Sequence, residues 1–404
     1  MKYIVVLCDG MADTPCPALE GRTPMEAARK PAMDRLAPHS EVGMVRTVPE
    51  GFSPGSDVAN LAVLGYDVRD CYTGRSPLEA ANIGIDLAED DVAFRCNLVT
   101  LSGEPDFSQK TLLDYCAGDI HTADAEPLIK AVQETFGGEE FDFHTGTAYR
   151  HCMVWHHGEA DPGRLTPPHD ITGNVIGPYL PAGEAAAPLL DRMQRSYSLL
   201  AGHPVNRERE NRGLPPANAI WLWGQGKRPR LQSFRERYGL SGAIVSAVDL
   251  LKGIGRLAEM QVCDVPGATG YIDTNYEGKR RAALEALKNG CDFAYIHIEA
   301  PDECGHRGEP ANKVKAIEDI DRLVLAPLLE ELQGLGDPFA LLVLPDHPTP
   351  LSVRTHTADP VPYLLYRSEA VTGDGPERFT EETARATGRY IPEGCTLLKR
   401  MITR

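Results

Sequence analysis

Three short apolar segments each end abruptly in polar residues: residues 3–8, 293–298 and 339–344. Apolar runs of this length, containing β-branched and aromatic residues, are typical of strands that are buried on both faces, as in a parallel sheet. From Ala311 onward, apolar residues recur at intervals of three and four, which predicts an amphipathic helix that Pro327 kinks or ends. Strands that alternate with such helices predict an α/β fold with right-handed crossovers.

The middle of the chain breaks this pattern. Residues 163–188 and 202–229 are rich in proline and glycine, and the second stretch also contains many arginines. The strand and helix pattern returns at residues 243–259. Since 404 residues exceed the size of a usual single core, we expect an inserted second domain. The expected boundaries are residues 1–75 and 232–404 for a split catalytic domain, 76–231 for the inserted domain, and 224–232 for the linker that returns from it.

Composition excludes two classes of partner. The chain carries 41 Lys and Arg against 58 Asp and Glu, a formal net charge of −17, with no basic tail or stripe for a nucleic-acid backbone. The apolar runs are too short to span a membrane.

The ten cysteines form no C-x-x-C pair, and no signal-peptide core precedes Asp9. This pattern indicates reduced thiols and a cytoplasmic protein.

Acidic residues and histidines follow the predicted strands. The carboxyl ends of parallel strands meet at one edge of a sheet, so residues that follow them are expected to converge there. Clustered carboxylates repel one another unless a cation lies between them. Asp and His together suit Mn²⁺ or Zn²⁺, and six such side chains are enough for two ions. The candidate ligands are Asp9, Asp302, Asp346, His306, His347 and His356.

Ser56 is the candidate nucleophile. It follows a Pro-Gly turn and begins a predicted helix, where free N–H groups and the helix dipole favour an oxyanion. The alternative interpretation is that Ser56 is only the N-cap of that helix.

Two candidate nucleotide-binding motifs are disfavoured. Residues 253–258 loosely match G-x-G-x-x-A but do not follow a strand directly, and residues 224–227 lack the first glycine of a phosphate-binding loop.

The motifs together resemble a known family. They are residues 9–13 (DGMAD), 55–61 (GSDVANL), 74–82, 166–173, 246–250, 273–279, 302–306, 346–347 and 355–356. In these residues the chain is similar to the archaeal-type cofactor-independent phosphoglycerate mutases of the alkaline phosphatase superfamily. The resemblance covers nearly the whole chain. It implies an alkaline-phosphatase-like α/β core, with a mostly parallel sheet flanked by helices, and a smaller inserted α/β domain.

The resemblance also implies a division of the metal ligands. Asp9, Ser56, Asp346 and His347 would hold one ion around the nucleophile. Asp302, His306 and His356 would hold the second. Mn²⁺ is the favoured metal, with Zn²⁺ and Mg²⁺ as alternatives. The family requires neither 2,3-bisphosphoglycerate nor a nucleotide.

The implied reaction interconverts 3-phosphoglycerate and 2-phosphoglycerate through a phosphoserine at Ser56. Fixed cations are needed for the small phosphorylated acid, and the candidates are Arg75, Arg150, Arg209 and Lys279. His121 is the candidate acid/base group. The family pattern places this histidine at the position of Asp119, so the sequence departs from the pattern at the acid/base group.

Several other functions share parts of this site. A related branch proposed to phosphorylate homoserine would use the same metal site and Ser56 with another acceptor. A phosphomonoesterase would need only the first domain, and a metal-stabilised binding module would need no nucleophile. A sulfatase is disfavoured because no candidate nucleophile lies in a C-x-P-x-R segment. A homo-oligomer is compatible with the sequence.

Overall fold

The computed structural model describes residues 1–403, which form two compact units. The first unit consists of Met1–Tyr72 together with residues 230–403, and the second is Thr73–Pro229. None of the helices in the described residues is both long and apolar enough to cross a membrane. All ten cysteines lie in the described residues, and none of them forms a disulfide.

An eight-stranded sheet forms the centre of the first unit. In spatial order its strands are β13 (Tyr390–Ile391), β2 (Glu41–Val45), β12 (Val361–Arg367), β11 (Phe339–Leu344), β1 (Lys2–Cys8), β10 (Phe293–Ile298), β8 (Gly242–Val245) and β9 (Gln261–Cys263). β1 pairs in parallel with both β10 and β11, and only β12 runs antiparallel to its neighbours. The three apolar segments are therefore central parallel strands, which confirms the predicted fold class.

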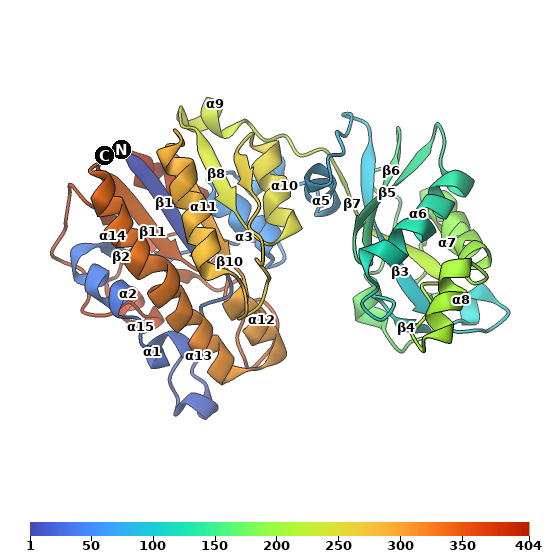
Figure 1. The fold of residues 1–404 in the computed structure, drawn as a ribbon, viewed down its shortest axis with the longest axis horizontal. Coiled ribbons are helices and arrows are strands. Elements are labelled where there is room, and N and C mark those ends of the chain that lie inside the picture. Colours follow the sequence, from blue (N-terminus) through green and yellow to red (C-terminus); the bar gives the residue numbers. More distant parts are fainter. Residues whose placement is uncertain (404) are drawn as a thin grey trace. The chain divides into compact units, whose positions relative to one another are not determined.

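Helices cover both faces of this sheet. Figure 1 shows α11 (Tyr276–Lys288) and α14 (Ala326–Leu335) crossing in front of it. They pack in one core with Ile4 and Val6 of β1. On the other face, Tyr295 donates a hydrogen bond to α3 (Ser56–Val63). The other helices of the unit are η1 (Pro17–Leu19), α1 (Pro24–Ala27), α2 (Pro31–Leu36), η2 (Ala37–His39), α4 (Val68–Cys71), α9 (Phe234–Tyr238), α10 (Asp249–Leu257), α12 (Ala300–Arg307), α13 (Pro310–Asp319), α15 (Glu381–Ala386), η8 (Gly394–Thr396) and α16 (Leu397–Ile402).

The helix does not end at Pro327, so that part of the prediction was wrong, while a kink at this residue stays a prediction. The helical pattern that begins near Ala311 continues through a π-helical segment, η7 (Ile320–Leu325), and Pro327 stands in the first turn of α14 instead of ending a helix. The wider π turn changes the hydrogen-bond register just before the proline, so its missing N–H is tolerated. The loose G-x-G-x-x-A match lies largely within α10 and forms no strand-to-helix turn.

The second unit is built on an antiparallel sheet. Its strands follow the order β4 (Leu112–Asp114), β3 (Val92–Leu101), β6 (Arg150–Trp155) and β5 (Phe141–Thr147), with β7 (Ala219–Lys227) also paired to β3. Residues 224–227 therefore belong to a strand. They were expected to be linker, but their backbone pairs with β3, as in the match of Lys227 to Val92. The helices are α5 (Ser76–Asn82), η3 (Phe107–Gln109), α6 (Thr122–Phe136), η4 (Pro168–Ile171), η5 (Gly177–Tyr179), η6 (Glu184–Ala186), α7 (Ala187–Leu200) and α8 (Pro204–Asn211).

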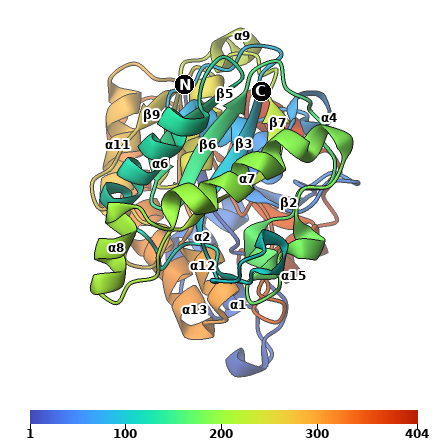
Figure 2. The same ribbon diagram turned by 90° about the vertical axis from the view of Figure 1, so that its right-hand side faces the viewer.

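The two faces of this second sheet differ. Figure 2 shows α6 and α7 lying across one face, where they share a large core with Phe94. The residue before Phe94 in β3 points the other way, so Ala93 packs in a smaller core with Ala80 of α5. This alternation also places Arg95 on the α5 face. A charged side chain from the central strand therefore lies beside α5.

Candidate active site

The predicted metal ligands lie at the carboxyl ends of central strands in the first unit. β1 and β10 end at the same level, because their register pairs Cys8 with Ile298. The backbone after β1 then turns at Gly10, whose φ is 62°. A Cβ atom on Gly10 would stand 2.6 Å from the Cα of Asp302 in α12. The close approach of the two segments brings the residues after β1 next to those after β10.

Three predicted ligands, each from a different segment of the chain, converge on the imidazole of His347, the fourth ligand of this group. Its Nε2 lies 3.1 Å from Oγ of Ser56, 3.4 Å from Oδ2 of Asp346 and 3.6 Å from Oδ1 of Asp9. The two aspartates and the histidine are buried. The four side chains expected to hold the first ion, including the nucleophile Ser56, therefore form one compact group.

Ser56 is not a helix cap. The N-cap of α3 is Gly55, and its first turn has no side-chain cap. Ser56 is the first helical residue, and its hydroxyl faces His347. The interpretation of Ser56 as a simple N-cap was wrong, because the preceding glycine takes the cap position. The hydroxyl oxygen is left in the positive end of the helix dipole, which favours an oxyanion.

The second predicted group is equally compact. Nε2 of His306 lies 3.2 Å from Oδ2 of Asp302, and Nε2 of His356 lies 3.4 Å from Oδ1 of the same carboxylate. The two Nε2 atoms are 2.9 Å apart. Asp302 and His306 are four residues apart in α12, so both side chains leave the same face of the helix.

Backbone carbonyls orient both imidazoles of this second group. Nδ1 of His306 is 3.0 Å from the carbonyl oxygen of Arg354, and Nδ1 of His356 is 3.3 Å from that of Pro54. A carbonyl can only accept, so each Nδ1 carries the proton and donates. In the neutral imidazole, Nε2 then has a lone pair directed at its neighbours. This arrangement is usual for histidines that bind metal ions.

The charges in the site are poorly balanced by the protein alone. Burial, followed by the charges of Asp346 and Asp302, raises the pKa of Asp9 well above its ordinary value. Burial also opposes ionisation of Asp302, but hydrogen bonds with His306 and His356 hold the pKa of Asp302 well below its ordinary value. The hydrogen bond to Asp302 in turn raises the pKa of His306 to about 9.

These residues fit divalent cations. Oδ1 of Asp9 is buried and accepts no hydrogen bond from residues 1–403. Ligand atoms of Asp9, Asp302 and Glu299 lie within 4.8 Å of one another, so the two groups are adjacent. A cation would satisfy the orphaned oxygen and remove the repulsion among the carboxylates. The mixture of carboxylate and imidazole ligands suits Mn²⁺ and Zn²⁺ best.

Asn60 supports the nucleophile, and the sequence analysis missed it. It lies one helical turn after Ser56, and its Nδ2 donates to the carbonyl of Ser56 and to Oδ2 of Asp346, both at 2.8 Å. Its Oδ1 accepts from the hydroxyl of Tyr295 at 2.6 Å. In the sequence, the signal for Asn60 was an amide side chain among the apolar residues of this helix. The structure adds that the amide is fully buried.

Two further supporting residues were also missed. Thr349 is buried, and its hydroxyl donates to Oδ1 of Asp302. His297 lies within β10, with Nε2 2.9 Å from Oδ2 of Asp9 and Nδ1 3.1 Å from Oγ of Ser246. Burial lowers the pKa of His297 to about 3, so the imidazole is neutral. In the sequence it was one member of an apolar run, and only its polarity could have marked it.

A basic cluster lies on the α5 face of the second unit. Glu79 forms ion pairs of 2.9 Å with Arg75 and with Arg95. Burial opposes ionisation of Glu79, but the charges of Arg95, Arg75 and Arg150 lower its pKa. The guanidinium of Arg95 lies 4.3 Å from the centre of the Trp223 ring. Three guanidiniums around one carboxylate leave an excess of positive charge that suits an anion. Arg95 was not predicted.

Three other predicted residues have different surroundings. Arg209 is buried, paired with Asp124 at 2.9 Å and bonded to two backbone carbonyls, which gives its guanidinium a structural role and argues against substrate binding. Lys279 is fully buried in the first unit and donates to the carbonyl of His297 at 3.1 Å. Burial lowers the pKa of Lys279 to about 8. His121 is exposed at the start of α6, and its side chain forms no cap.

The fold and the site define the class of the protein. It is an α/β protein with an inserted second unit and a candidate two-metal site that surrounds a serine. Within this class, the chain belongs to the family of 2,3-bisphosphoglycerate-independent phosphoglycerate mutases. The model of that family matches residues 37–206.

Relatives of full length support this assignment. The chain is 51% identical over 404 residues to a probable 2,3-bisphosphoglycerate-independent phosphoglycerate mutase of Geobacter sulfurreducens, with 100% of each chain covered. It is 49% identical over 385 residues to the mutase of Methanosarcina barkeri, with 95% of each covered. Among solved structures, the cofactor-independent phosphoglycerate mutase of Thermoplasma acidophilum is 30% identical, with 100% of this chain and 99% of that chain covered and a TM-score of 0.65. The PH0037 protein of Pyrococcus horikoshii is 29% identical, with 99% and 96% covered and a TM-score of 0.81.

Proposed function

We propose that this chain interconverts 3-phosphoglycerate and 2-phosphoglycerate through a phosphoserine at Ser56, without free 2,3-bisphosphoglycerate. The observation that carries the proposal is the position of the Ser56 hydroxyl. It lies 3.1 Å from His347, inside a cluster of buried carboxylates and imidazoles, and it has no capping role. Family membership supplies the substrate and the reaction.

Two divalent cations fit the candidate site. Asp9, Ser56, Asp346 and His347 would hold one ion, and Asp302, His306 and His356 the other. When bound, such ions lower the pKa of the serine hydroxyl and neutralise the oxygens of the phosphoryl group. Mn²⁺ is our proposed metal, because it accepts both carboxylate and imidazole ligands.

The reaction itself requires two transfers at Ser56. In the first, Oγ forms a bond to phosphorus, the bond to the 3-oxygen of the substrate breaks, and that oxygen takes up the proton that the serine loses. In the second, the 2-oxygen of glycerate forms a bond to phosphorus, the bond between phosphorus and Oγ breaks, and Oγ takes up the proton that the 2-hydroxyl loses. Asn60 positions the backbone of Ser56 and the carboxylate of Asp346 throughout, since one amide group bonds to both.

The basic cluster of the second unit is our candidate for holding the anionic groups of the substrate. Arg75 and Arg150 were predicted for this role, and Arg95 joins them because it shares the same glutamate. Guanidiniums bind carboxylate and phosphate through paired hydrogen bonds. Lys279 lies beside the metal ligands, and its proposed role is to attract the negative charge of Asp9.

We also propose a cytoplasmic location. Its support is the set of ten cysteines, which form no disulfide among the described residues. Such cysteine usage is typical of a reducing compartment.

The test uses purified protein loaded with Mn²⁺, 3-phosphoglycerate and an enolase-coupled readout. We expect turnover by the wild type and none by Ser56→Ala with an unchanged melting temperature. ATP-dependent phosphorylation of homoserine without mutase turnover would instead identify the homoserine branch. Release of inorganic phosphate as the main product would identify a phosphomonoesterase. Full activity of Ser56→Ala would contradict the assignment of the nucleophile.

A further inference from the structure

A pocket of about 420 Å³ lies in the first unit and is lined in part by the loop between β11 and β12, which carries three predicted metal ligands: Asp346, His347 and His356. Its volume is in the usual range for small-molecule sites. Pro348 and Thr357 line it, and each directly follows a predicted ligand, His347 and His356 respectively. The pocket therefore shares a wall with the candidate metal site but contains none of its ligands.

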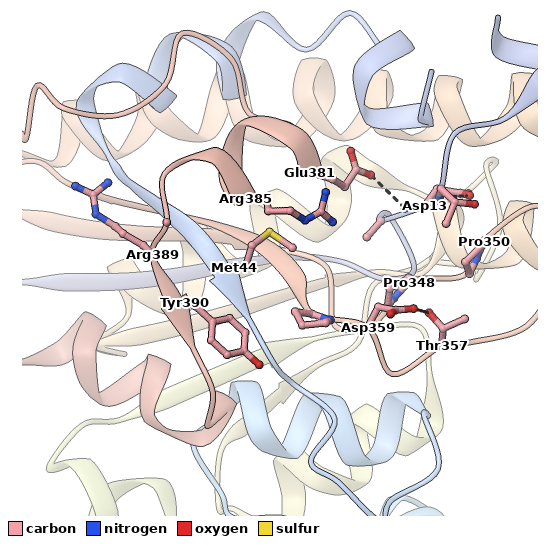
Figure 3. Close-up of a pocket in the computed structure, with 14 residues that line it drawn as sticks. Asp13, Met44, Pro348, Pro350, Thr357, Asp359, Glu381, Arg385, Arg389 and Tyr390 are labelled. Carbon is pink, nitrogen blue, oxygen red and sulfur yellow. Dashed lines mark hydrogen bonds between the residues drawn. The ribbon is translucent and has the colours of Figure 1, made fainter. Parts of the chain in front are cut away.

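The pocket presents two opposite charges that do not pair with each other. Figure 3 shows the Arg385 side chain extending past Met44 toward the middle of the pocket. Within residues 1–403, Arg385 has no ion pair or hydrogen bond to a side chain. Asp359 also lines the pocket, and its Oδ2 accepts a hydrogen bond from Thr357 at 2.8 Å. The charges of Arg385 and Asp359 are thus available to a ligand.

The other carboxylates that line the pocket already have hydrogen-bond or ion-pair partners within the protein. Glu381 accepts from the backbone N–H of Asp13 at 3.1 Å and from the hydroxyl of Thr23 at 2.8 Å. Burial raises the pKa of Glu381 to about 7, which reduces its negative charge near neutral pH. Asp13 is neutralised by Lys313 at 2.7 Å, and both side chains are fully buried. Glu381 and Asp13 therefore form part of the pocket wall, and their carboxylates are not available to bind a ligand.

The remaining lining favours a small, partly apolar ligand. Met44, Pro348, Pro350 and Pro360 give the pocket apolar sides. One guanidinium can pair with one carboxylate in a bidentate manner. Two arginines line the pocket, but Arg389 is paired with Asp374, which leaves Arg385 as the unpaired cation among the lining residues described. A phosphate would bring about two negative charges toward Asp359 with that one unpaired cation to balance them, which disfavours it. A ligand with a hydroxyl or ammonium group could donate to Asp359 at the same time.

We propose that this pocket is a regulatory site for a small organic acid that carries one carboxylate and one hydroxyl or ammonium donor. The carboxylate pairs with Arg385, and the donor bonds to Asp359. This site is distinct from the proposed catalytic site, and its regulatory effect rests on the proposed function.

A hydrogen-bonded path joins the wall of the pocket to the candidate metal site. Nζ of Lys313 donates to Asp13 and, at 2.8 Å, to the carbonyl of Thr349. The hydroxyl of Thr349 donates to Asp302, a predicted metal ligand. A ligand that shifts the loop after His347 therefore changes the position of metal ligands. By linkage, the ligand and the metal must alter each other's affinity by the same factor.

Calorimetry with the Mn²⁺-loaded protein tests binding without turnover. L-alanine and L-lactate are the probes with a donor, propionate is the probe without one, and inorganic phosphate is the control for the catalytic site. We expect alanine or lactate to bind with a Kd near or below about 1 mM, and propionate to bind about tenfold more weakly. Absence of saturable binding by both probes, or equal binding of propionate, overturns the proposal.

Matched arginine variants locate the binding. Arg385→Gln should abolish binding of the probe, and Asp359→Asn should weaken it. Arg389→Gln is the control, because Arg389 also lines the pocket but its guanidinium points away from the middle of it in Figure 3 and pairs with Asp374. Both arginines are at least partly exposed, so the melting temperature should not change. Binding that survives in Arg385→Gln places the ligand elsewhere and overturns the proposal.

The regulatory effect is measured as a change in metal dependence. In the enolase-coupled assay, the bound probe should change the Mn²⁺ concentration for half-maximal activity by about fivefold or more, and Arg385→Gln should remove this change. Binding with an unchanged metal dependence overturns the regulatory part. Failure of the proposed function would look different, because turnover would then be missing even without a probe.

Discussion

Replacement of Thr349 by valine tests how the candidate metal site is supported. Thr349 is fully buried, and its hydroxyl donates to Oδ1 of Asp302. Valine has nearly the same shape but places a methyl group against the carboxylate. The backbone carbonyl of Thr349, which accepts from Lys313, is unaffected by the substitution. The change therefore removes the hydrogen bond to Asp302 and the longer contact of 3.4 Å between the hydroxyl and Nδ1 of His347, and little else.

The magnitude follows from the charge of the acceptor. A hydrogen bond to a charged group contributes about 1.5–3 kcal/mol. The other partners of Asp302 are His306 and His356, which are predicted ligands and cannot replace the lost donor. Loss of such a supporting bond typically lowers metal affinity by about 10–100-fold. We expect Thr349→Val to bind Mn²⁺ more weakly by a factor in this range.

Thr349→Ser is the matched control. Serine keeps the hydroxyl but removes a buried methyl group, which costs about 1 kcal/mol of folding free energy. The serine variant should therefore be slightly less stable yet bind Mn²⁺ like the wild type, whereas the valine variant should bind Mn²⁺ more weakly. The assay is calorimetric titration of chelator-stripped protein with Mn²⁺, together with melting temperatures. Valine and wild-type affinities within about twofold, or equal losses in both variants, would refute the reasoning.

Three further predictions concern separate parts of the molecule. All three tryptophans lie in the second unit, so chelation should lower the unfolding temperature seen by circular dichroism but leave the fluorescence transition in place; a shift of both would contradict a metal site confined to the first unit. His156 contacts Asp142 at 3.0 Å and Asp91 at 2.9 Å, and these hydrogen bonds raise its pKa. The protonated imidazole therefore adds stability that is complete below about pH 6.5 and is lost as pH rises through the raised pKa, so the advantage of wild type over His156→Gln in urea unfolding should shrink from pH 6 to pH 9. Arg95→Lys keeps the charge but loses the planar guanidinium over Trp223, so KM for 3-phosphoglycerate should rise by about tenfold or more with a smaller change in kcat; an unchanged KM would remove Arg95 from the substrate site.

The central strands and their polar ends could be predicted because they depend on local patterns. A fully buried parallel strand needs an unbroken apolar run, and residues 293–298 and 339–344 match β10 and β11 from end to end. The acidic residues after these strands then converge through topology alone. The helix after Ala311 was predicted in outline, but its π-helical segment was missed, since a π turn has no distinct periodicity in the sequence.

The supporting residues could not be predicted in the same way. Asn60, Thr349 and His297 support the site through hydrogen bonds to partners 47 or more positions away, and the residues next to them in the sequence do not indicate those partners. Arg95 and Arg209 show the same limit. Both are arginines in the second unit, yet one lies over Trp223 beside two other guanidiniums, whereas the other is committed to Asp124 and backbone carbonyls. Only packing separates a cation that is available to substrate from one that supports the fold.

The most direct test of the account is to look for the phosphoserine itself. The Mn²⁺-loaded protein is mixed with 3-phosphoglycerate whose phosphoryl group is radiolabelled, quenched in acid and digested, and the labelled peptide is sequenced by mass spectrometry. The account predicts label on Ser56, its disappearance on a chase with unlabelled substrate, and no label in Ser56→Ala. Mutase turnover by Ser56→Ala, or label that resides on another residue, would contradict it.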